Sequence, residues 1–184
     1  GGPPVLNPDY APDGYNLATL LARLWIGGIF FAHGYRHLKA VRSGPGMANW
    51  FESLGLRNGR LQAFNVTYLE LAAGVALILG LLTPLAYGGA ASIVLVALVT
   101  NHKKNGFWSF LPGEGWEYTG TLTAICIALA AFSPGKWSLD DVIGWDFPFE
   151  PDTALAISAA IGILGTALFL AVFWRRPAPA DGEG

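Results

Sequence analysis

The stretch that decides the fold is YLELAAGVALILGLLTPLA, from Tyr68 to Ala86, in which two apolar runs meet at a Thr-Pro pair. Proline is tolerated in the first turn of a helix but interrupts a helix interior, so one helix ends here and another begins. The apolar runs on the two sides approach the roughly 20 residues that cross a hydrocarbon core. We therefore predict a tight hairpin of two membrane-spanning helices, over residues 65–82 and 84–100.

The composition of the whole chain also indicates a membrane protein. Of its 184 residues, 53% are hydrophobic and 13% are charged, and the mean hydropathy is +0.43. A soluble domain carries about 25% charged residues, so lipid is the expected main solvent. The formal net charge of −2 gives no sign of a nucleic-acid partner. The single cysteine, Cys126, excludes an internal disulfide and is predicted to be an inert buried thiol. The first residues do not follow a secretory signal pattern.

Three further apolar runs complete a predicted set of five spans, over residues 17–38, 118–132 and 153–174. Short cytoplasmic loops carry an excess of Lys and Arg, which sets the orientation. With five crossings, one side has Lys136 alone, and the other has Arg36, Lys39, Arg42, Arg57, Arg60, Lys103, Lys104, Arg175 and Arg176. We therefore expect a multi-pass membrane protein with the N-terminus outside and the C-terminus cytoplasmic.

The predicted fold class is an all-α integral membrane four-helix bundle with a fifth, C-terminal transmembrane helix. Its parts are an extracytoplasmic segment 1–16, the bundle 17–141, an acidic outer loop 142–152, the fifth helix 153–174 and a cytoplasmic tail 175–184. The run 118–132 is short for a span, so its helix is expected to begin inside the preceding loop. Small residues in the fifth span let helix backbones approach closely, so this helix could dock on the bundle or on another protein. They are Ala156, Ala160, Gly162, Gly165 and Thr166.

Two further features of the sequence need a structural interpretation, an arginine inside the first span and an amphipathic segment after it. Arg23 lies inside the first span towards its outer side, where Asp13 or Asp9 is the expected partner in a structural ion pair. The segment from Met47 to Leu54 has apolar residues at the spacing of an amphipathic helix. That helix either lies on the membrane surface or packs on the bundle.

Ionisable residues converge at the predicted cytoplasmic third of four consecutive spans. Histidines 33 and 37 are one helical turn apart at the end of the first span, and the glutamate of the second span lies at a similar depth. Ionisable groups inside a membrane are costly and by default mark a functional site. The predicted site consists of His33, Arg36, His37, Glu70, His102 and Glu117.

Glu70 is the member of this set that least resembles a surface residue, because its neighbours in the span are apolar. A buried carboxylate needs a cation, a donor or a proton, and Arg36 or His33 is the nearest expected partner. Structural interpretations of the others stay open. His102 could be a hydrated helix end, His37 could extend to the interface, and Glu117 could satisfy a helix N-terminus.

Three chemistries suit the cluster. Four of its members, His33, His37, Glu70 and His102, could ligate zinc, iron or copper. A histidine beside a carboxylate could instead hold a quinone headgroup and pass protons. The flanking rings for such a site would be Tyr35, Tyr68, Trp108 and Tyr118. The third interpretation is that the cluster only locks the helices together.

Several stretches, taken in order, resemble the DoxX family of small bacterial membrane proteins. They are LARLWIGGIFFAHGYRHLK, WFESLGL, YLELAAGVALILGLLTPLA, NHKKNGF and GWEYTGTLTAICIALAAFSPGKWSLD. The resemblance covers roughly residues 17–141 and implies a four-helix bundle in the bacterial inner membrane that is associated with redox metabolism. Relatives include subunits of thiosulfate:quinone oxidoreductase and components of complexes that handle oxidative or thiol stress. The positions that the resemblance implicates are His33, Glu70, His102 and Glu117.

Two functional hypotheses follow. In the first, the chain is an accessory subunit of a bacterial redox or respiratory membrane complex, and its fifth helix and outer loop dock on other subunits. Removing residues 150–184 should then release the partners and leave the bundle folded. In the second, it is an oxidoreductase module that binds a quinone or a transition metal through the cluster. The sequence contains no complete catalytic motif, so it does not decide whether the protein is an enzyme. A small-solute transporter is a weaker third hypothesis.

Overall fold

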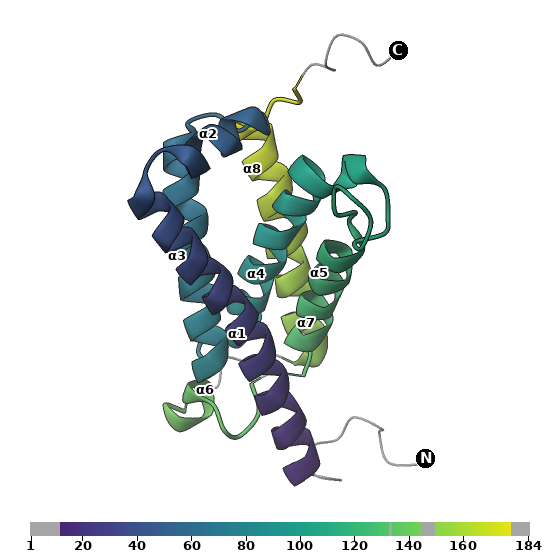
Figure 1. Cartoon of the computed structure of the whole chain (residues 1–184). Coiled ribbons are helices and arrows are strands. Elements are labelled where there is room, and N and C mark those ends of the chain that lie inside the picture. Colours follow the sequence, from purple (N-terminus) through teal and green to yellow (C-terminus); the bar gives the residue numbers. More distant parts are fainter. Residues whose placement is uncertain (1–11, 133, 145–149, 178–184) are drawn as a thin grey trace.

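The computed structural model describes residues 12–132, 134–144 and 150–177, and every regular element in these ranges is a helix (Figure 1). The elements are α1 (Pro12–Ser43), α2 (Gly46–Ser53), α3 (Gly59–Leu79), α4 (Thr83–Ala97), a π turn (Leu98–His102), a 3₁₀ turn (Lys103–Asn105), α5 (Glu117–Ala130), α6 (Leu139–Val142), α7 (Pro151–Ala160), a second π turn (Ile161–Gly165) and α8 (Thr166–Phe173). The predicted all-α class is confirmed.

The long helices run alternately between two ends of the molecule (Figure 1). The α2 end holds the α1–α3 connection, the loop after α4 and the last residues of α8. The α6 end holds the α3–α4 turn and α6. The connections that carry the nine cations therefore share the α2 end, while Lys136 lies beside α6. Which of the two ends faces the cytoplasm stays a prediction.

Four helices are long and apolar enough to cross a membrane, namely Asp13–Ser43, Gly59–Leu79, Thr83–Asn105 and Pro151–Phe173. The third is longer than predicted, because two turns of π and 3₁₀ geometry continue α4 to Asn105. The remaining predicted span is α5, with only 14 residues. At 1.5 Å per residue it is about 21 Å long, against a hydrocarbon thickness of about 30 Å. The short fourth span is thus confirmed as a helix but does not by itself match the membrane thickness.

The predicted α3–α4 hairpin is confirmed, and its turn has unusual backbone geometry. α3 ends at Gly80, in the left-handed region with φ +66°, and Leu82 is also left-handed with φ +50°. Pro84 occupies the first turn of α4, where its missing N–H leaves no hydrogen bond unmade. Gly80 and Pro84 together account for the sharp reversal that the sequence predicted.

α1 and α3 pack through glycines. A β-carbon built on Gly74 would lie 2.6 Å from the backbone nitrogen of Phe31, and one built on Gly27 would lie 2.8 Å from the carbonyl oxygen of Gly74. Gly34 has the same relation to the backbone of Leu71, at 2.8 Å. The two backbones are therefore in direct contact over this crossing, as expected of small residues at helix interfaces in membranes.

Two apolar clusters fill the interior. The larger one includes Phe30, Leu77 and Cys126, which is fully buried as predicted for an inert thiol. The smaller one lies at the α2 end and includes Met47 and Phe51 of α2. Because the side chains of Met47 and Phe51 are buried in this cluster, α2 packs on the bundle, which is one of the two predicted placements of the amphipathic segment.

The fifth helix, formed by α7, the second π turn and α8, docks on α4. Ser158, Gly162 and Thr166 are buried, and the Thr166 hydroxyl donates to the carbonyl oxygen of Ser92 at 3.2 Å. A β-carbon on Gly162 would lie 3.2 Å from the β-carbon of Ala91. Of the two sites proposed for the small residues, the bundle is therefore the one they contact, although Ala156 and Ala160 are exposed.

The end of α8 is also tied to the α2–α3 turn. The Trp174 indole donates to the Leu54 carbonyl at 2.8 Å, and the Arg175 N–H donates to the Gly55 carbonyl at 2.9 Å. The Arg57 N–H donates to the Phe173 carbonyl at 2.8 Å. The fifth helix is thus built into the bundle at both of its halves. The expectation that residues 150–184 can be removed without unfolding the bundle does not agree with these contacts.

The docking of the fifth helix predicts that one substitution within it destabilises the protein and that another has little effect. Gly162→Leu should lower the free energy of unfolding by about 1–3 kcal/mol, because the added atoms must push Ala91 of α4 away. Ala156→Leu is the matched control, because this side chain is exposed and should stay within about 0.5 kcal/mol of wild type. Unfolding in detergent micelles, followed by circular dichroism, measures both. Equal effects would contradict this packing.

Candidate functional site

The α1–α3 crossing brings two of the predicted site residues together. His37 Nδ1 lies 2.7 Å from Glu70 Oε2, and the Glu70 side chain is 8% exposed against 24% for His37. The ring N–H is not aligned for a hydrogen bond to this oxygen, so the contact is an electrostatic one. It is an ion pair only when the His37 imidazole carries a second proton.

The predicted partners of Glu70, Arg36 and His33, were wrong, and the reason is the register of α1. The stripe of α1 that turns towards the protein interior includes Phe30 and Gly34, and continues three residues later to His37. Both Arg36 and His33 are exposed. His33 still touches His37 edge-to-face, with ring centroids 6.3 Å apart and an interplanar angle of 80°. The exposed His33 imidazole thus lies beside the half-buried His37 imidazole, which contacts Glu70.

The other two predicted site residues belong to a different place, the loop between α4 and α5. His102 Nδ1 lies 2.7 Å from the carbonyl oxygen of Glu114. The Glu117 carboxylate accepts hydrogen bonds from the N–H and the hydroxyl of Ser109, at 3.2 and 3.0 Å. Both side chains therefore hold the loop, and neither contacts the His37–Glu70 pair.

The residues proposed as metal ligands, His33, His37, Glu70 and His102, are not assembled around one point. Within the described ranges, no group of three or more His, Cys, Asp or Glu side chains could hold a metal ion. At the α1–α3 crossing one imidazole lies against a buried carboxylate, with a second imidazole beside it.

Sequence reasoning missed a buried polar network at the α6 end. Arg23 is only 1% exposed and donates to the Trp137 carbonyl, and it interacts electrostatically with Asp140. The Asp140 carboxylate accepts from the N–H groups of Leu82 and Thr83, at 2.8 and 3.0 Å, and from the Thr83 hydroxyl at 2.7 Å. Asp140 thus caps the start of α4 while its charge faces Arg23.

The expected partners of Arg23 were Asp13 and Asp9, which the structure does not support. Asp9 lies outside the described residues, and Asp13 is exposed at the start of α1. The signal that could have found Asp140 is its position in the PGKWSLD stretch, which follows the fourth span and so returns to the outer end of α1.

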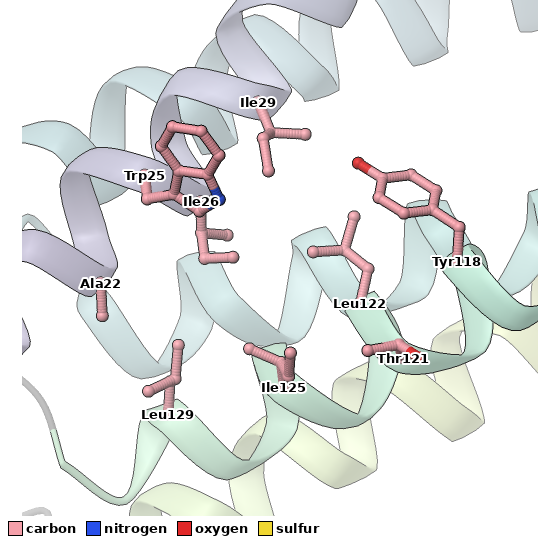
Figure 2. Close-up of a pocket in the computed structure, with 9 residues that line it drawn as sticks. All are labelled: Ala22, Trp25, Ile26, Ile29, Tyr118, Thr121, Leu122, Ile125 and Leu129. Atoms are coloured by element: carbon pink, nitrogen blue, oxygen red, sulfur yellow. The ribbon is translucent and has the colours of Figure 1, made fainter.

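An apolar groove of about 280 Å³ lies between α1 and α5 (Figure 2). Figure 2 shows that the Tyr118 hydroxyl points from α5 towards Ile29 of α1. The groove is lined by Ala22, Trp25, Ile26, Ile29, Tyr118, Thr121, Leu122, Ile125 and Leu129. Tyr118 was expected to flank a site formed with His33 and Glu70, but its groove is formed by other residues of α1 and by α5.

Comparison with known proteins places part of the chain in a family. Residues 18–103 match the model of the DoxX family. A curated protein that the chain resembles is the "Putative oxidoreductase CatD" of Bacillus subtilis (strain 168). It is 29% identical over 115 residues, which cover 62% of this chain and 80% of the relative. No solved structure matches the chain.

The matched region contains the residues of the His37–Glu70 pair. It begins in α1, includes the His37–Glu70 pair and the α3–α4 hairpin, and ends at Lys103. α5, Asp140 and the fifth helix lie beyond it. The helices long enough to span a membrane agree with the membrane character of the family. Residues 18–103 of this chain match the DoxX family model, which confirms the family resemblance inferred from the sequence.

Proposed function

We propose that the protein is an accessory integral-membrane subunit of a bacterial redox complex. The observation that carries this proposal is the outer face of the fifth helix. In its most apolar window 17% of the residues are buried, against 33–44% in the other three spans. The helix contacts the bundle through one narrow face and exposes Leu155, Ile163, Leu164, Leu168 and Val172. The redox assignment is supported by the match to the DoxX family model and by the name of the relative.

The test is co-purification from native membranes in a mild detergent, followed by mass spectrometry. We expect the wild-type protein to be recovered with oxidoreductase subunits. The double variant Leu164→Trp/Leu168→Trp should lose most of them, because larger rings on this face displace a packed protein partner but not fluid lipid. Leu21→Trp, on the exposed side of α1, is the matched control and should retain the partners. Recovery of the wild-type protein alone would overturn the proposal.

The His37–Glu70 pair favours a second candidate, a redox module that binds a quinone and exchanges protons with it. The residues offer a protonatable imidazole against a buried carboxylate, with the exposed His33 beside it. This is the chemistry that quinone reduction and oxidation require of a protein, because protons must reach the headgroup as electrons do.

Quantifying quinone extracted from the purified protein tests this second candidate. His37→Gln and Glu70→Gln should each lower the bound quinone about tenfold, since a hydrogen bond to a charged group contributes roughly 1.5–3 kcal/mol. Arg36→Gln is the control, because Arg36 is exposed at the position before His37 and takes no part in the pair. A wild-type preparation without quinone, or equal losses in all three variants, would exclude this module.

A further inference from the structure

The loop between α4 and α5 joins two helices of different length. From Thr83 to Asn105 the third span has 23 residues and α5 has 14, which correspond to about 34 Å and 21 Å. Ala86 near the start of α4 and Ala130 at the end of α5 belong to the same core cluster. α5 therefore begins well below the end of the 3₁₀ turn, and the loop descends along the bundle to reach it (Figure 1).

The depth of the loop follows from the membrane thickness. The hydrocarbon core is about 30 Å thick and the headgroup regions extend it to about 40–45 Å. A helix as long as the third span reaches into the headgroups, whereas α5 stops short of them. We therefore expect residues 106–116, at the α2 end, to lie at the depth of the boundary between acyl chains and headgroups.

Backbone at that depth must find its hydrogen-bond partners inside the protein, and several backbone groups of this loop do so. The Asn105 side chain donates to the Gly113 carbonyl, and His102 Nδ1 donates to the Glu114 carbonyl, which can only accept. Glu117 accepts from the Ser109 N–H. Other bonds within the loop are Leu111 N–H to Trp108, Glu114 N–H to Leu111, Gly115 N–H to Trp108, Trp116 N–H to Gly106 and Glu117 N–H to Phe107.

The same loop exposes large apolar side chains. Phe110 is 75% exposed, and it packs on Trp108 with ring centroids 5.6 Å apart. Phe107 contacts both Trp108 and Trp116, at 5.0 and 4.8 Å. Leu111 is exposed as well. These contacts order four rings into one surface, and aromatic rings favour the headgroup boundary over water.

Two exposed lysines, Lys103 and Lys104, come directly before this surface. The exposed acid of the loop is Glu114, while the Glu117 carboxylate is engaged by Ser109. The excess of positive charge beside these rings is complementary to anionic lipid headgroups.

We propose that residues 103–116 form an anionic-phospholipid binding site, in which the rings of the loop insert at the headgroup boundary and Lys103 and Lys104 bind lipid phosphates. His102, Asn105 and Glu117 are the positioning residues of this site, because they hold the loop that presents the rings. The partner is the bilayer's own anionic lipid, and the site is independent of the proposed redox role.

Spin-label depth measurements test the insertion. Phe110→Cys would carry a nitroxide, and the native Cys126 is fully buried and should not react. Asn49→Cys, on the exposed side of α2 at the same end, is the matched control. In vesicles of phosphatidylethanolamine and phosphatidylglycerol (3:1), the ratio of oxygen to nickel-chelate collisions should be several-fold higher at position 110 than at position 49. Equal ratios would show that the loop lies in water and would overturn the proposal.

Lipid charge provides the second arm of the test. In vesicles of phosphatidylcholine alone, the label at position 110 should become more mobile than in the anionic vesicles. The double variant Lys103→Gln/Lys104→Gln should remove this difference, because the lysines are what recognise the negative charge. Mobility that does not depend on anionic lipid in the wild type, or a dependence that the double variant retains, would exclude the lysines as the lipid ligands.

Discussion

Replacing Asp140 with alanine is expected to lower the free energy of unfolding by about 3 kcal/mol, because it leaves buried hydrogen-bond donors without their charged acceptor. The N–H groups of Leu82 and Thr83 and the Thr83 hydroxyl would all lose this acceptor at the turn that starts α4. The buried Arg23 would also lose the favourable electrostatic effect of the carboxylate. A single substitution thus destabilises the α6 end of α1 and the hairpin together.

The neighbouring aspartate makes a matched control for this prediction. Asp141 is exposed, and its described hydrogen bonds are made by backbone atoms: its N–H donates to Ser138 Oγ, and its carbonyl accepts from the Gly144 N–H. Asp141→Ala should therefore stay within about 0.5 kcal/mol of wild type. Asp140→Asn keeps an acceptor oxygen but loses the charge, and its stability should lie between the two. Denaturant titration in micelles measures all three, and similar midpoints for Asp140→Ala and Asp141→Ala would contradict the assigned network.

Gly74→Ala is expected to cost about 3 kcal/mol, near the upper end of what overpacking a well-filled interface usually costs. Its new β-carbon would meet the Phe31 nitrogen at 2.6 Å and the Gly27 carbonyl oxygen at 2.9 Å. Both are backbone atoms, which cannot rotate away as a side chain would, so α1 and α3 must separate. Because His37 and Glu70 face each other across the same two helices, their contact should weaken as well.

A second glycine of α1 serves as the control for Gly74. Gly28 is adjacent to Gly27, but a β-carbon built on it has no heavy atom within 4 Å. Gly28→Ala should therefore be neutral or stabilise the helix by about 0.5–1 kcal/mol, the usual gain from replacing glycine in a helix interior. Hydrogen exchange of the α1 amides, combined with the unfolding midpoint, reports on both variants. If Gly28→Ala destabilises as much as Gly74→Ala, the crossing does not depend on this close approach.

Several features of the molecule were determined by local sequence. The hairpin at Thr83 and Pro84 follows from two apolar runs separated by a residue pair that cannot continue a helix. The buried thiol of Cys126 and the helical class follow from the apolar content of each segment. Such properties depend on the length and composition of one stretch of chain, so they can be predicted without knowing its neighbours.

The partners of the charged residues were decided only by the tertiary structure. Glu70 contacts His37 rather than His33 or Arg36, because the glycines of α1 set which stripe of the helix turns inward. Arg23 donates to the carbonyl of Trp137, which is distant in sequence and reaches it only after three more passes of the chain. Spacing along a helix limits which side chains share a face. The rotation of that helix against its neighbours comes from packing in the whole bundle, and packing selects the partner.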